Sequence, residues 1–234
     1  MVNIGLNYLH RCLLAGNCLL CAARASAGKD LCVACEQALP RTAWACPRCA
    51  AHGAVMESEG QSCGHCQQQP PAYISTHAAF RYAFPVNKLI QQLKFRDHLE
   101  HARLLGSYLA RHLQTLNDPL PDVVVPVPLH PSRLRERGYN QSLEIARVVA
   151  RSLRLPLDWK NAQRIRPTLP QMELPREQRR QNVRGAFRTE AVFAGQRVAI
   201  VDDVMTSGHT VEALAGSLLQ SGAQEVRVWV VARA

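Results

Sequence analysis

The pattern of apolar and polar residues predicts that strands and helices alternate along the C-terminal two thirds of the chain. Residues 198–201 form a run of four apolar residues, which is typical of a short strand buried on both faces. A polar stretch follows, and apolar residues then recur at helical spacing until Gly222. The apolar positions of this predicted helix are Val211, Leu214, Ala215 and Leu218.

The remaining apolar patterns complete an α/β fold. We expect a strand or hairpin at 73–84, two helices within 86–116 that break near 96–98, a strand at 122–128, a helix from Asn140 onward and a final strand at 226–231. Together these elements predict a mostly parallel sheet flanked by helices. Lys94, beside core positions of the first helix, is expected to be solvated, with a phosphate contact as the alternative.

Nine cysteines all lie within the first 66 residues, and eight of them form four Cys-x-x-Cys pairs. Two such pairs provide four thiolates for a tetrahedral zinc site, so four pairs predict two zinc ions. Joining consecutive pairs is the simplest arrangement, and an interleaved one stays open. Disulfides and redox chemistry are the alternatives, disfavoured by a reducing compartment and by the lack of a βαβ pattern around the pairs. The predicted ligands are Cys18, Cys21, Cys32, Cys35, Cys46, Cys49, Cys63 and Cys66.

A polar, proline-bearing stretch at residues 67–71 separates two predicted domains, a double zinc ribbon at 1–69 and an α/β domain at 72–234. The formal net charge of +10 favours a polyanionic partner or substrate. Arginines are concentrated between residues 133 and 188, where they suit bidentate phosphate contacts, although a solvated basic face is the alternative. No apolar run is long enough to span a membrane and no secretory signal is convincing, so we expect a cytoplasmic protein.

The polar stretch after the 198–201 strand has the strongest candidate chemistry. Asp202 and Asp203 come at the expected end of the strand, where open α/β sheets bind their ligands. Residues 206–210 are small and rich in hydroxyls, and Gly208 can adopt a positive φ. Backbone N–H groups at a helix N-terminus bind phosphate, and neighbouring carboxylates hold sugar hydroxyls or a hydrated Mg²⁺. A ribose 5-phosphate fits this combination, whereas an ordinary buried strand before a capped helix and a receiver-like Mg²⁺ site are the alternatives.

Residues 198–210 resemble the phosphoribosyl diphosphate (PRPP) signature of type I phosphoribosyltransferases. That signature has four apolar residues, two acids, two variable positions and then Thr-[Ser/Thr]-Gly-x-Thr. The resemblance implies that Asp202 and Asp203 are catalytic and face the ribose hydroxyls, and that the loop after them binds the 5-phosphate. His209 occupies a variable position, so its side chain is expected to point away from the ligand. The implied binding residues are Val204, Met205, Thr206, Ser207, Gly208, His209 and Thr210.

Three further motifs resemble the competence-protein ComF/GntX family. They are residues 126–142 (PVPLHPSRLRERGYNQS), the pattern Arg164-x-Arg166-x-Thr168-x-x-Gln171, and the segment 179–187 with its paired arginines. The resemblance covers essentially the whole chain. It implies an N-terminal zinc ribbon joined to a phosphoribosyltransferase domain, and a role in handling incoming DNA during competence or DNA uptake.

Two arginine-containing segments are expected to complete the PRPP site. A basic loop with Arg133, Arg135 and Arg137 follows the 122–128 strand and suits the diphosphate of PRPP together with Mg²⁺. Residues 164–176 are expected to be the mobile loop that closes over PRPP, with a plain surface excursion as the alternative. Its predicted binding residues are Arg164, Arg166 and Gln171.

The sequence therefore predicts PRPP-dependent phosphoribosyl transfer with Mg²⁺, to an acceptor that the residues do not identify. The rival interpretation is a non-enzymatic PRPP sensor, or an adaptor that binds single-stranded DNA and DNA-uptake proteins. Aromatic residues make up only 6% of the chain, which leaves few for base stacking. The intact acids at positions 202 and 203 favour a functional PRPP site.

Overall fold

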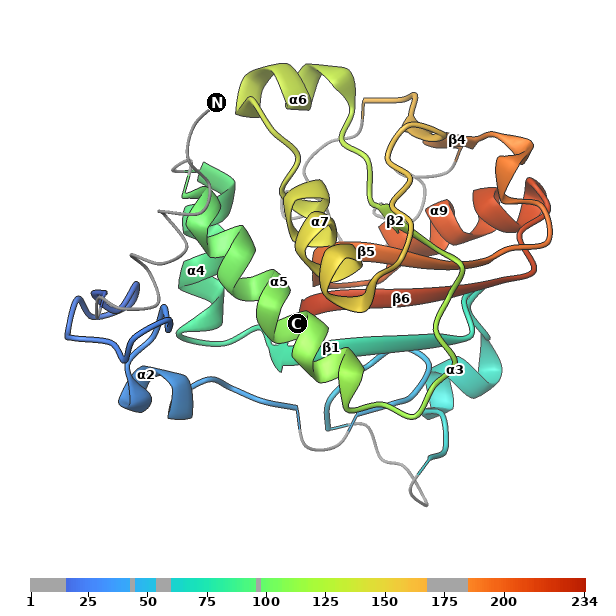
Figure 1. Ribbon diagram of the computed structural model, residues 1–234. Coiled ribbons are helices and arrows are strands. Elements are labelled where there is room, and N and C mark those ends of the chain that lie inside the picture. The colour runs from blue at the N-terminus through green and yellow to red at the C-terminus, as the bar shows by residue number, and fades with distance from the viewer. Residues whose placement is uncertain (1–15, 43–44, 54–59, 96–97, 168–184) are drawn as a thin grey trace.

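The computed structural model describes residues 16–42, 45–53, 60–95, 98–167 and 185–234 (Figure 1). Its centre is a four-stranded sheet of order β1-β6-β5-β2, in which all neighbouring strands are parallel. A separate antiparallel ladder joins β3 to β4. The predicted parallel sheet is thus confirmed. The strand bounds are β1 (Ser75–Arg81), β2 (Val123–Pro126), β3 (Ala162–Arg164), β4 (Phe187–Thr189), β5 (Arg197–Met205) and β6 (Glu225–Arg233).

Helices cover both faces of the sheet. The helices α4 (Val86–Phe95), α5 (Leu99–Gln114) and α7 (Gln141–Leu153) pack on one face, and α9 (His209–Gln220) packs on the other. Figure 1 shows α5 and α7 side by side in front of the strands. Within the part of the chain described here, no helix is both long and apolar enough to cross a membrane. The short helices are α2 (Val33–Gln37), α3 (Gly64–Gln68), α6 (Pro131–Arg137) and η2 (Ala191–Phe193).

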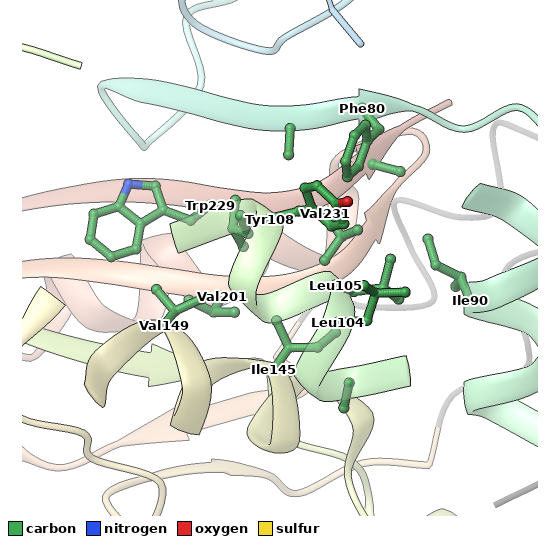
Figure 2. Packing of buried hydrophobic residues seen from close by; sticks show 14 of the residues in the cluster. Phe80, Ile90, Leu104, Leu105, Tyr108, Ile145, Val149, Val201, Trp229 and Val231 are labelled. Atoms are coloured by element: carbon green, nitrogen blue, oxygen red, sulfur yellow. The ribbon is translucent and has the colours of Figure 1, made fainter. Parts of the chain in front are cut away.

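The side chains of each central strand alternate between two apolar clusters. In β5, Ala199 and Val201 belong to the cluster with α4, α5 and α7, whereas Val198 and Ile200 belong to the cluster with α9. Successive residues of a strand point to opposite faces, so a strand covered on both faces needs an uninterrupted apolar run. The apolar run at 198–201 follows from this burial. Figure 2 shows the first cluster, in which the sheet residues Val201, Trp229 and Val231 lie near the helix residues Tyr108, Ile145 and Val149.

The strand β5 is longer than the apolar run predicts. It continues through both acids to Met205, and its ladder with β6 pairs Asp202 with Val230 and Val204 with Ala232. Acidic residues are rare in a strand interior, but these two have partners of their own, described below. The acids therefore lie inside the last part of the strand and not in the loop after it.

Two arginine-containing segments also differ from the prediction. The expected basic loop after β2 is the helix α6, because Pro131 starts it, the His130 side chain caps it and Gly138 ends it with a φ of 81°. The expected mobile loop begins as a strand, since Arg164 is the last residue of β3 and pairs with Phe187. Residues 168–176 of that loop, including Gln171, lie outside the described residues.

The close approach of α5 to α7 depends on Gly106. A Cβ at this position would lie 2.8 Å from Val148 Cβ and 3.1 Å from the Ile145 carbonyl oxygen. We expect Gly106→Ala to force the helices apart and to lower the free energy of unfolding by about 1–3 kcal/mol. Thermal unfolding measures this loss, at roughly 2–4 °C per kcal/mol for a chain of this size. Gly216→Ala is the matched control, because nothing lies within 4 Å of its added Cβ; equal destabilisation by both variants contradicts the prediction.

Candidate active site

The end of β5 and the start of α9 form the part of the candidate site that the sequence predicts to bind phosphate. Gly208 caps α9 with a φ of 80°, a left-handed conformation that glycine adopts without strain. A Cβ there would also lie only 2.8 Å from Met205 Cε. The Ser207 hydroxyl is buried, and no hydrogen-bond partner for it is found among the described residues. A buried donor just before a helix N-terminus suits an anion, so this loop fits a phosphate group.

Asp202 is buried, and two donors hold its carboxylate. Its Oδ1 accepts hydrogen bonds from the Ser142 hydroxyl at 2.7 Å and from the backbone N–H of Asp203 at 2.9 Å. Burial, helped by the negative charge of Asp203, raises the pKa of Asp202 to about 7, although Ser142 and Lys94 act in the opposite direction. Asp202 can therefore gain or lose a proton near neutral pH, and a bound cation favours its ionised form.

Asp203 forms an ion pair with Lys94 from the last turn of α4. The Lys94 Nζ lies 2.6 Å from Asp203 Oδ2, and the Asp203 side chain is only 4% exposed. Burial lowers the pKa of Lys94, but the Asp203 carboxylate outweighs this and raises it, so the lysine stays charged. The expectation of a solvated Lys94 is wrong, because a buried carboxylate requires a charged partner.

Arg164 of β3 interacts electrostatically with Asp202 and with one arginine of α6. Burial lowers the pKa of Arg164 in β3, while the charge of Asp202 raises it and the charge of Arg133 in α6 lowers it. Arg137, also in α6, donates to Gln141 Oε1 at 2.6 Å. The structure thus brings Arg164 close enough to interact with both Asp202 and Arg133, whereas Arg135 and Arg166 are exposed to solvent.

The other predicted loop residues line the same connection. Met205 is buried against Gly208, and the remaining members are partly exposed. Lys94 and Ser142 were not assigned to the site from the sequence. Ser142 lies inside the family motif at 126–142, so the motif could have indicated it. For Lys94, the sequence shows only a lysine beside core positions, a pattern that fits a solvated lysine as well as a site residue. The partly exposed members are Val204, Thr206, His209 and Thr210.

The eight paired cysteines form two groups of four. In each group the four sulfur atoms lie within 4.8 Å of one another. The Sγ–Sγ distances of 3.7 Å for Cys21–Cys32 and 3.8 Å for Cys49–Cys63 match the roughly 3.8 Å edge of a tetrahedron with Zn–S bonds of about 2.3 Å. The donor set therefore fits zinc, and the groups join consecutive pairs. The first group is Cys18, Cys21, Cys32 and Cys35, and the second group is Cys46, Cys49, Cys63 and Cys66.

Backbone N–H groups prepare one thiol of each group for metal binding. Burial raises the pKa of Cys18, but hydrogen bonds from the backbone, the largest from Cys32, lower it to about 6 overall. In the second group the Cys63 N–H lies 3.2 Å from Cys46 Sγ, and backbone donors lower the pKa of Cys46 to about 7 against the effect of burial. None of these eight cysteines forms a disulfide bond. Such N–H···S contacts stabilise thiolates, the form that binds zinc.

The raised pKa of Asp202 predicts that stability depends on pH. Its ordinary pKa is 3.8 and its native pKa is about 7, so the folded protein binds this proton more tightly than the unfolded chain does. The stabilisation from Asp202 is therefore complete below about pH 4 and is lost as the pH rises to about 7. We expect Asp202→Asn to flatten this part of the stability curve, as measured by urea unfolding across the range. Parallel curves for the wild type and the variant contradict the raised pKa.

Comparison with known proteins identifies both parts of the chain. The phosphoribosyl transferase domain family matches residues 139–234, and the double zinc ribbon domain family matches residues 9–67. The DNA utilization protein YhgH of Escherichia coli (strain K12) is 35% identical over 223 residues, covering 93% of this chain and 97% of the relative. Competence protein F of Haemophilus influenzae is 32% identical over 225 residues, covering 93% of this chain and 96% of the relative.

One solved structure, the allosteric regulatory enzyme of purine biosynthesis, is 27% identical over 55% of this chain and 25% of its own, with a TM-score of 0.38. The phosphoribosyl transferase match includes Asp202, Asp203 and α9, and the zinc ribbon match includes all eight paired cysteines. The resemblance stated from the sequence motifs is confirmed by the two relatives. The chain belongs to the ComF/YhgH family, with a double zinc ribbon and a phosphoribosyltransferase domain.

Proposed function

We propose that the chain binds PRPP·Mg²⁺ and transfers its phosphoribosyl group to an acceptor. One observation supports this most directly: two buried acids lie in the last part of a central strand, and a short loop joins that strand to a left-handed glycine at a helix N-terminus. This combination places negative carboxylates beside a phosphate-binding loop. A ribose 5-phosphate has hydroxyls for the acids and an anion for the loop.

The loop at residues 206–210 holds the 5-phosphate. Backbone N–H groups at the start of α9 and the Ser207 hydroxyl donate to the phosphate oxygens. The helix α9 has 12 residues, so its aligned peptide dipoles add a partial positive charge at this end. Gly208 adopts a φ of 80° at this point, a left-handed backbone conformation that is strained for residues with a side chain.

Asp202 and Asp203 bind the ribose hydroxyls and stabilise the transition state. The bond from the anomeric carbon to the diphosphate breaks as the acceptor forms its own bond to that carbon, and positive charge develops on the sugar. Fixed carboxylates in a buried site stabilise that charge without reorganisation. Lys94 pairs with Asp203 and holds its carboxyl group in place. Asp202 and Asp203 would hold a bound Mg²⁺, which would neutralise the negative charge of the leaving diphosphate.

Arginines on α6 and β3 suit the diphosphate of PRPP. Arg164 interacts electrostatically with Asp202 and with Arg133, and exposed Arg135 and Arg166 extend the positive charge from the same two segments. One guanidinium group can donate two parallel hydrogen bonds to a phosphate, and this geometry orients the leaving group. We assign the same role to Arg137 and to Gln171.

Release of diphosphate tests transfer itself. We expect zinc-loaded protein with PRPP and Mg²⁺ to release diphosphate when the correct acceptor is present in a panel of nucleobases and amines. Gly208→Val should abolish release, because a β-branched residue is strained at the φ of 80° that Gly208 adopts. Saturable PRPP binding with no release for any acceptor contradicts catalysis and leaves a PRPP-binding protein.

A second candidate function is single-stranded DNA binding, as in an adaptor for DNA uptake. The net charge of +10 favours it, and so do the names of the relatives, a DNA utilization protein and a competence protein. If the basic residues around α6 bind the DNA backbone, affinity should fall steeply with salt, since each neutralised phosphate releases counterions. Fluorescence anisotropy with a single-stranded oligonucleotide measures this, and PRPP should compete. Binding that is insensitive to salt contradicts the candidate.

A further inference from the structure

The second cysteine group contacts the phosphate loop through Arg233, near the end of β6. The Arg233 Nε donates to the carbonyl oxygen of Cys49 at 2.9 Å, and Nη1 donates to that of Met205 at 3.0 Å. Nη1 also donates to the carbonyl oxygen of Thr206. One guanidinium group therefore joins a cysteine ligand's backbone to the first residues of the loop.

Two more contacts connect the same regions. The backbone N–H of Ala72 donates to the carboxylate of Glu212, in the first turn of α9, at 3.1 Å. Tyr73 is buried in the apolar cluster that also contains the four second-group cysteines and Met205. Its hydroxyl would lie 3.4 Å from a Cβ on Gly208. The loop at residues 206–210 and the start of α9 therefore lie next to the second cysteine group and to the residues that follow it.

The first cysteine group packs elsewhere. Cys18 belongs to the other apolar cluster, on the face of the sheet covered by α4, α5 and α7. The polar contacts of this region go to α5, where Arg103 pairs with Asp30 and the Tyr108 hydroxyl donates to Glu36 at 3.0 Å. None of the contacts described for the first group reaches residues 205–212, so the two groups have separate structural roles.

We propose that Arg233 is a positioning residue for the phosphate loop, and that it makes PRPP affinity depend on zinc at the second cysteine group. This inference deepens the proposed PRPP binding. Zinc fixes the turn that contains Cys49, and Arg233 passes that constraint to the carbonyl groups of Met205 and Thr206. Those carbonyl groups set the direction of the peptide units just before Ser207 and Gly208. A loop held in its binding conformation loses less entropy when phosphate binds.

Arg233→Met removes the hydrogen bonds and keeps most of the apolar stem. We expect PRPP·Mg²⁺ to bind about tenfold more weakly, with zinc content and thermal midpoint close to those of the wild type. Arg227→Met is the matched control, because Arg227 lies in the same strand and donates to the carbonyl oxygen of Pro119 and to Glu225 at the other end of the sheet. Arg233→Lys, which retains a cationic donor, should recover part of the affinity.

Amide hydrogen exchange separates this inference from the proposed function, because it needs no ligand. We expect faster exchange in residues 206–212 of Arg233→Met and of Cys66→Ser, and wild-type exchange there in Arg227→Met and in Cys35→Ser, a first-group variant. If the wild type fails to bind PRPP, the proposed function is wrong while exchange still decides the coupling. Wild-type exchange at 206–212 in folded Arg233→Met, or equal acceleration in Arg227→Met, overturns it.

Discussion

Replacing Asp202 and Asp203 together with asparagine is expected to weaken PRPP·Mg²⁺ binding by about 100-fold or more. Asparagine keeps the size of each side chain but removes its charge. A hydrogen bond to a charged group contributes about 1.5–3 kcal/mol, which corresponds to roughly tenfold or more for each acid. Calorimetric titration of the wild type and the double variant with PRPP and Mg²⁺ measures the difference.

The control for this variant is Asp122→Asn. Asp122 is an exposed acid at the start of β2, where it pairs with Arg197 at 2.7 Å, away from the phosphate loop. Its loss should leave PRPP affinity unchanged. A purely structural role of the buried acids predicts altered unfolding with no selective loss of ligand. Wild-type affinity in the folded double variant would therefore contradict the assigned role.

Metal analysis is expected to find two zinc ions for each chain. Eight thiolates in two tetrahedral groups bind them, and structural zinc sites contribute on the order of 10 kcal/mol to the folding of small ribbons. A strong chelator should therefore unfold the cysteine-containing region. The second group lies in the apolar cluster with Met205 and Val211, so its loss should also lower the thermal midpoint of the α/β part.

Single cysteine variants test the two zinc sites separately. Cys12→Ser should retain both zinc ions, because Cys12 is the one cysteine outside the four pairs. Cys21→Ser and Cys63→Ser should each lose one zinc ion, from the first and the second group respectively. Protein purified under reducing conditions that contains no zinc would show that the cysteines have another role.

The sequence predicts the fold well where burial dictates residue type. The apolar run at 198–201 is needed because β5 is covered on both faces, and α9 shows the predicted apolar positions at Val211, Leu214, Ala215 and Leu218. Gly208 has the positive φ that the sequence predicts for the loop before α9. The strand end was placed too early because a pattern of apolar residues stops at Asp202, whereas hydrogen bonds with β6 continue to Met205.

Long-range contacts explain what the sequence could not predict. From the sequence, Lys94 resembles a surface lysine beside core positions of α4. The fold places its Nζ 2.6 Å from Oδ2 of Asp203, a residue 109 positions later in the chain. Arg233 has no local motif at all, and its partners at Cys49 and Thr206 come from distant segments. The sequence predicts a loop at α6 because most of its seven residues are polar, so no apolar residues recur at helical spacing.

Titration of the wild-type protein with PRPP tests the central claim most directly. The protein should first be shown to contain zinc and to unfold cooperatively, and the titration should be done near pH 8, about one unit above the pKa of Asp202. We predict saturable binding of one PRPP per chain that requires Mg²⁺ and weakens as the pH falls below about 7. Absence of saturable PRPP binding in this folded, zinc-loaded protein would contradict the account.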